Sequence, residues 1–93
     1  MSDAYEHIVV NIIKQQESLI GPVAVERAKM VGGMTLDWPK KTVSFTGEPS
    51  SVIDSLVDQY KVLFGQISVE VCKEAVGSIL NGLNSEEVPS SLR

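Results

Sequence analysis

Apolar residues recur with a helical period in the part of the chain that runs from Gly47 to Leu83. Their steps of one, three and four residues fit the turn of about 3.6 residues in an amphipathic helix and not the strict alternation of a strand. They form one stripe before Gly65 and one after it, on Val52, Ile53, Leu56, Val57, Tyr60, Leu63 and Phe64 and then on Cys72, Ala75, Val76, Ile79, Leu80 and Leu83. We therefore predict two helices, with Gly65 as a left-handed C-terminal cap and a link too short to separate them.

The residues at the starts of these two helices suggest specific caps. Ser51, followed three residues later by Asp54, resembles a variant of the capping box. Ser68 is in position to cap the second helix, and the spacing of Ile67 and Cys72 around that start is typical of a hydrophobic staple.

Two further amphipathic helices are predicted upstream, over residues 3–20 and 23–31, with Gly21 and Pro22 ending one and starting the other. Gln16 lies inside the first apolar stripe. Its amide either sits at the rim of the core with its polar end in water, or makes an interhelical or intersubunit hydrogen bond that fixes register. Arg27 lies in the second stripe, where it either packs its stem and reaches solvent or a carboxylate, or binds an anionic ligand or a partner's acidic residue.

After Gly32 and Gly33 the apolar period changes to two, which predicts strands. The alternation covers residues 34–38 and 42–46, with Met34, Leu36, Trp38, Val43 and Phe45 as the apolar positions. A turn containing Pro39 separates the two runs, so we predict an antiparallel hairpin with one face on the helices and its outer edges open. Open edges are usually blunted or paired, and pairing with a second copy would give a four-stranded sheet and a homodimer.

Together these elements predict an α+β fold in the order α-α-β-β-α-α, with four amphipathic helices packed against a two-stranded antiparallel hairpin. Residues 1–83 are expected to form a single domain. Residues 84–93 are polar, contain a proline and lack a period, so we predict a flexible C-terminal tail.

Composition narrows the classes of function. The chain has 93 residues, 43% of them hydrophobic and 22% charged, as in an ordinary globular protein. A net charge of −4 argues against a phosphate-binding surface, and the single cysteine excludes an intrachain disulfide and a multi-cysteine zinc site. Neither a secretory signal nor a run of roughly 18 apolar residues is present, so we expect a cytoplasmic location and no membrane partner.

The sequence offers no catalytic constellation. Cys72 lies in the centre of an apolar stripe, where a cysteine is typically structural, and His7 points away from its stripe without further metal ligands nearby. The acidic pair Asp54 and Asp58 is predicted on a solvent-facing side, and an enzyme would need two acids brought together by the fold. We therefore expect no catalytic residue, no metal and no cofactor.

Trp38 is the strongest candidate for a binding residue, because it stands at the hairpin tip beside Lys40 and Lys41. An exposed Trp with flanking cations suits a partner's groove or an acidic segment, while the alternative is an indole folded back onto the core. With Arg27 and Gln16, these residues form the predicted binding set.

The favoured hypothesis is a self-associating protein-interaction module, regulatory or accessory and without catalysis, that pairs through the hairpin edge or a helix face. One alternative is a sensor that binds an anionic metabolite through Arg27 or Gln16. Another is a nucleic-acid binder similar in element order to a winged helix, since two helices precede a hairpin, although only Arg27 and Lys29 would give its recognition helix a positive charge.

Overall fold

In the part of the chain that the structure describes, four α-helices and one β-hairpin follow each other in the predicted order, and the α+β fold is confirmed. The computed structural model describes residues 3–84 and 86–92. Its elements are α1 (Asp3–Ile20), α2 (Val23–Lys29), β1 (Met34–Asp37), β2 (Thr42–Phe45), α3 (Pro49–Phe64), α4 (Gln66–Leu80) and a short 3-10 helix, η1 (Ser90–Leu92). None of the helices in these described ranges is both long enough and apolar enough to cross a membrane.

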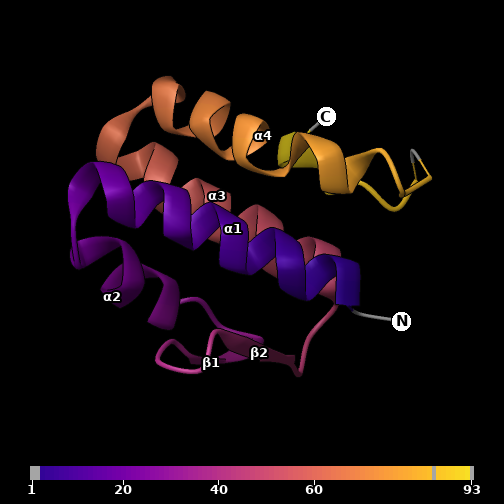
Figure 1. The fold of residues 1–93 in the computed structure, drawn as a ribbon, viewed down its shortest axis with the longest axis horizontal. Helices are drawn as coiled ribbons and strands as arrows, with labels where there is room; N and C mark the ends of the chain where they lie inside the picture. The colour runs from indigo at the N-terminus through magenta and orange to yellow at the C-terminus, as the bar shows by residue number, and fades with distance from the viewer. Residues whose placement is uncertain (1–2, 85, 93) are drawn as a thin grey trace.

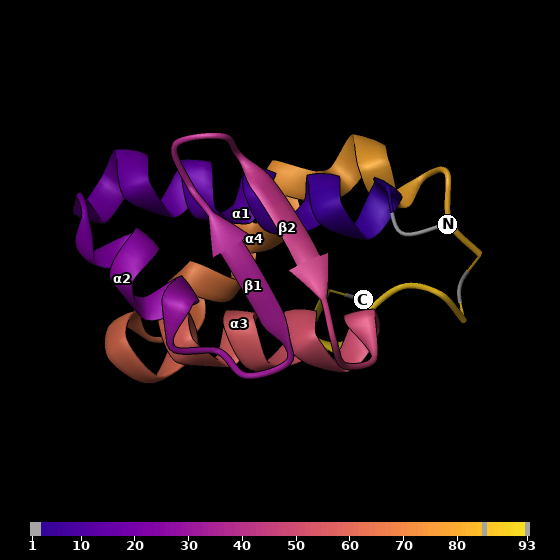
Figure 2. The same ribbon diagram turned by 90° about the horizontal axis from the view of Figure 1, so that it is seen from below.

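The helices form a bundle that the hairpin covers from one side. In Figure 1, α1 and α4 lie in front of α3, with α2 and the hairpin below them. Figure 2 shows the two strands crossing beneath α1 and α3. The core between these elements is built from fully buried aliphatic side chains, chiefly Ile8, Ile12, Ile13, Ile53, Leu56 and Val76. Tyr60 adds a polar tie from α3 to α2, because its hydroxyl donates to the Ala24 carbonyl at 2.7 Å.

The start of α3 is capped by a residue that the sequence analysis did not consider. Glu48 is the N-cap, and its Oε1 accepts a hydrogen bond from the Ser51 backbone N–H at 3.0 Å. The predicted capping box of Ser51 and Asp54 is therefore wrong. The Asp54 carboxylate instead accepts hydrogen bonds from the Ser91 N–H and the Ser91 hydroxyl in the C-terminal segment.

The link between α3 and α4 is a single residue, Gly65, with a φ of 84° that favours glycine. Because α4 already begins at Gln66, Ser68 lies inside the helix and is buried, so it is not the N-cap. Ile67 is 70% exposed while Cys72 is fully buried, and the predicted staple between them does not form.

The strands pair in antiparallel register, with Met34 opposite Phe45 and Leu36 opposite Val43. The outer edge of β2 is not fully open, because the Val43 N–H donates to Glu6 Oε2 on α1 at 2.9 Å. That contact uses one of the backbone groups that edge pairing with a second copy would need.

The end of the chain packs against the helices in the part that the structure describes. Pro89 and Leu92 are buried, and η1 contacts both α3 and α4. The Tyr5 hydroxyl of α1 also donates to the Glu87 carbonyl at 2.8 Å. We predicted a flexible tail because residues 84–93 are mostly polar, but Pro89 and Leu92 within it are buried and hold the described part of the segment against the helices.

Candidate functional site

Trp38 folds back onto the core, which decides between the two orientations that the sequence left open. The side chain is only 9% exposed. Lys41 covers it, with Nζ at 4.3 Å from the centre of the ring and donating to the Trp38 carbonyl at 2.9 Å. The hairpin tip therefore presents the exposed Lys40 and Lys41 to solvent, and not the indole.

Gln16 is a buried link between α1 and α4. It is 1% exposed, and its Nε2 donates to the Ser68 carbonyl at 3.2 Å and to Cys72 Sγ at 3.4 Å. The expectation of an amide with its polar end in water is thus wrong, and the interhelical hydrogen bond is the arrangement that forms. Burial raises the pKa of the Cys72 thiol, with the Gln16 contact opposing that rise, so the thiol stays protonated at neutral pH.

Arg27 is half-buried on α2, and its Nη1 lies 3.9 Å from Met30 Sδ. Within residues 3–84 and 86–92, no hydrogen bond joins Arg27 to Gln16. The structure therefore does not link the two predicted ligand-binding residues through a polar contact. His7 is exposed, and within residues 3–84 and 86–92 there is no group of three or more His, Cys, Asp or Glu residues placed to hold a metal ion.

A cavity of about 260 Å³ lies between α3, α4 and η1. Its polar lining includes Asp54, Asp58 and Lys61 from α3 and Gln66 and Lys73 from α4. We predicted a solvent-facing side for the two aspartates; Asp58 is exposed, as predicted, whereas Asp54 is half-buried, and both line the cavity. The helical spacing of residues 54, 58 and 61 predicts that they share one face of α3. The sequence did not predict that the C-terminal segment lies beside this face.

Asp54 accepts hydrogen bonds from the C-terminal segment, which forms one wall of the cavity. Its Oδ1 accepts from the Ser91 N–H at 3.0 Å and from Ser91 Oγ at 2.6 Å, and its Oδ2 accepts from Ser90 Oγ at 2.9 Å. Desolvation by burial tends to raise the pKa of Asp54, but the hydrogen bonds from Ser91 and Ser90 outweigh it and lower the pKa below its ordinary value. Asp54 is thus an ionised acceptor at neutral pH and unsuited to act as a general acid.

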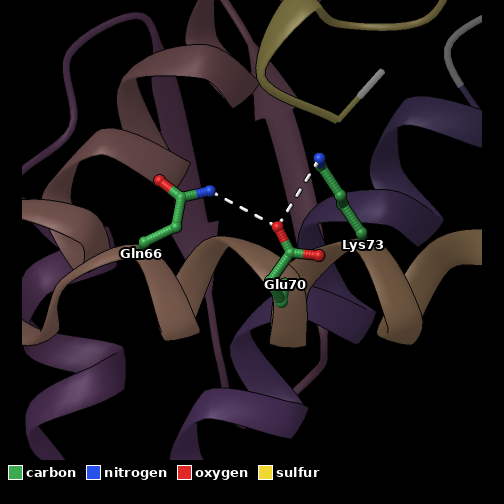
Figure 3. A network of polar contacts seen from close by, with 3 residues as sticks. All are labelled: Gln66, Glu70 and Lys73. Carbon is green, nitrogen blue, oxygen red and sulfur yellow. Dashed lines mark hydrogen bonds and ion pairs between the residues drawn. The ribbon is translucent and has the colours of Figure 1, made fainter.

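A small polar network lies along α4 at the rim of the cavity (Figure 3). Glu70 Oε2 accepts from Gln66 Nε2 at 3.3 Å and pairs with Lys73 Nζ at 3.7 Å. Both contacts run along α4, where residues three and four apart are neighbours. Glu70 therefore positions two side chains that line the cavity without lining it itself.

The turn between α3 and α4 exposes large apolar side chains. Val62 is 75% exposed, Ile67 is 70% exposed, and Leu63 and Phe64 are each 39% exposed. We call these four residues the α3–α4 corner; the turn lies at the left end of the molecule in Figure 1. No charged residue occurs between positions 62 and 69. Exposed apolar residues that gather in one part of a molecule mark interaction sites more often than scattered single residues do.

Comparison with protein-family models, with curated proteins and with solved structures finds no match for the chain. Evidence for its function comes from its own surfaces, of which the corner and the cavity are the most distinctive.

Proposed function

We propose that this chain is a cytoplasmic protein-interaction module, accessory or regulatory in role, that associates with a second copy of itself through the α3–α4 corner. The observation that carries the proposal is the group of exposed apolar residues at that corner, with Val62 and Ile67 each at least 70% exposed. Leaving such side chains in water forgoes roughly 1.5–3 kcal/mol for each one that a partner would fully bury. A contact that covers four of them supplies a substantial driving force for association.

A second copy is the partner that the distribution of charge favours. The chain carries a net charge of −4, so two copies repel each other overall. The corner adds nothing to this repulsion, because residues 62–69 contain no charged side chain. A two-fold symmetric contact brings the same patch of both copies together, and at the corner this places apolar residues against apolar residues.

The hairpin supports self-association less well than the corner does. Its strands are four residues each, and short edge strands are poor templates for pairing. Glu6 occupies the Val43 N–H on the β2 edge, and the Trp38 indole is turned inward. Pairing through the hairpin edge is accordingly the rival arrangement that the experiment must separate from the corner.

Sedimentation or light scattering over a range of concentrations tests the proposal. We expect the wild-type chain to form dimers that dissociate on dilution, and Ile67→Lys to shift the dissociation constant upward by on the order of a hundredfold, because a symmetric contact loses the apolar group twice and gains a buried charge. Met30→Lys is the matched control, since Met30 is 65% exposed but lies at the end of α2.

Circular dichroism would verify that both variants keep the helical fold. A wild-type chain that stays monomeric at high micromolar concentration contradicts the proposal. Equal weakening by the Ile67 and Met30 substitutions would show that the corner is not the contact.

A further inference from the structure

The cavity between α3, α4 and η1 has the size and the construction of a small-molecule site. Its volume of about 260 Å³ lies just below the roughly 300–1,000 Å³ typical of pockets for drug-sized ligands, so it suits a smaller metabolite. Val57 and Val69, both almost fully buried, give it an apolar base. Ser90 and Ser91, held by Asp54, close one side.

Both acidic and basic side chains line the cavity, and only some of them make hydrogen bonds or ion pairs with other residues of the described chain. Asp54 is satisfied by its serine donors, whereas the Asp58 carboxylate and the Lys61 ammonium make no hydrogen bond or ion pair with any residue in the described ranges 3–84 and 86–92. Lys73 is held at the rim by Glu70, at a separation of 3.7 Å that is long for a charged hydrogen bond. One carboxylate and two ammonium groups are therefore free, or nearly free, to meet a ligand.

This balance of charges selects among classes of ligand. A simple anion would meet the carboxylates of Asp54 and Asp58, and a simple cation would meet the ammonium groups of Lys61 and Lys73. We propose that the cavity binds a small zwitterion of the free amino acid class. Lys61 and Lys73 hold its carboxylate, Asp58 holds its ammonium group, and its side chain rests on the apolar base. This role is additional to self-association through the corner.

Titration of the full chain with each of the twenty standard amino acids, one at a time, tests this proposal. Backbone amide shifts of Val57 and Val69 in two-dimensional NMR spectra report on the cavity. We expect saturable shifts with at least one amino acid and none with inorganic phosphate or putrescine at the same concentrations. Absence of saturable shifts with all twenty would overturn the proposal, as would saturable binding of phosphate that matches the best amino acid, which would indicate an anion site.

Three substitutions assign the roles of the charged residues. Lys61→Met, Lys73→Met and Asp58→Asn are each expected to weaken binding of the best amino acid about tenfold or more, the usual effect of losing a charge-assisted hydrogen bond. Lys14→Met is the control, because Lys14 is an exposed lysine on α1 that does not line the cavity. Equal weakening by Lys14→Met would attribute the effect to net charge and contradict the assignment. Repeating the titration on Ile67→Lys separates the cavity from the corner, and we expect unchanged affinity.

Discussion

Removing the carboxylate of Asp54 is expected to release the C-terminal segment while the rest of the fold stays intact. Three hydrogen bonds from Ser90 and Ser91 end on this one group, at 2.6 to 3.0 Å. No other side chain in the described part of the chain receives as many donors from the segment. Asp54→Ala therefore isolates the polar half of the docking contact, and leaves the buried Pro89 and Leu92 in place.

The size of the effect follows from the number of bonds and their exposure. A buried hydrogen bond to a charged group is worth about 1.5–3 kcal/mol. Asp54 is only partly buried and Ser90 is exposed, so solvent screening reduces the sum of the three bonds to about 2 kcal/mol. The loss is local, because the hydrogen bonds that the substitution removes join the segment to α3 and none of them lies within the helical bundle. A docking equilibrium weakened by this amount opens roughly thirty times more often.

Native-state amide hydrogen exchange measures that opening directly. The Leu92 N–H, which donates to the Pro89 carbonyl at 2.9 Å, and the Ser91 N–H are the reporters. We expect both to exchange about thirtyfold faster in Asp54→Ala. Amides in the centres of α1 and α3 should be unaffected.

Asp58→Ala is the matched control, one helical turn further along α3 and without a bond to either serine. The reasoning is refuted if the Leu92 and Ser91 amides exchange at the same rate in Asp54→Ala as in the wild type. It is also refuted if the Asp58 variant accelerates them equally.

The hydrogen bonds between Asp54 and the C-terminal segment also make the docking of this segment depend on pH. Because the folded pKa of Asp54 is lowered from 3.8, its contribution to stability is fully present above 3.8 and is lost as the pH falls through the lowered value. The Ser91 amide shift should therefore titrate with the Asp54 carboxyl carbon at acidic pH, below the ordinary range of an aspartate. In Asp54→Asn this transition is expected to disappear, and its persistence would assign it to another group.

Substitutions at three further positions test the packing of the fold. Gly33 has a φ of 88° and an added Cβ would lie 2.8 Å from Val52 Cγ2, so Gly33→Ala should lower the free energy of unfolding in urea by about 1–3 kcal/mol. Tyr60→Phe leaves the buried Ala24 carbonyl without its 2.7 Å donor and should cost about 1–2 kcal/mol in the same assay; a loss near zero would show that water replaces the hydroxyl. Gln16→Leu keeps the volume of a buried side chain and should cost less than Gln16→Ala, which leaves a cavity costing about 2–5 kcal/mol; equal costs would make the amide's hydrogen bonds, which both variants lose, the dominant contribution.

Periodicity predicted the helices and strands because burial on one face repeats along a regular element. The bounds of α1 and α3 agree with the stripes that end at Ile20 and Phe64, and the alternation around Leu36 and Val43 gave two strands that pair in register. Gly65 was recognisable as the turn because a positive φ is best tolerated by glycine.

The caps and the site depend on contacts between distant segments, which a local pattern does not contain. Asp54 fits a capping position in the sequence, but its carboxylate accepts a hydrogen bond from Ser91, 37 residues further along the chain. The orientation of Trp38 depends on where the Lys41 side chain lies above it. The cavity is formed by two helices and the C-terminal segment. Because this segment is mostly polar, its sequence did not predict that Leu92 would be buried and would anchor it.

Distances between spin labels on two copies of the chain test the central proposal most directly. Labels are placed on Gln66→Cys, beside the corner, or on Ser44→Cys, on an exposed position of β2. The native Cys72 is fully buried with a raised pKa, so it should not react with the label. Association through the α3–α4 corner predicts a shorter distance between copies for the label at position 66 than for the label at position 44. A shorter distance for position 44, or no dipolar coupling for position 66 at concentrations where dimers form, would contradict it.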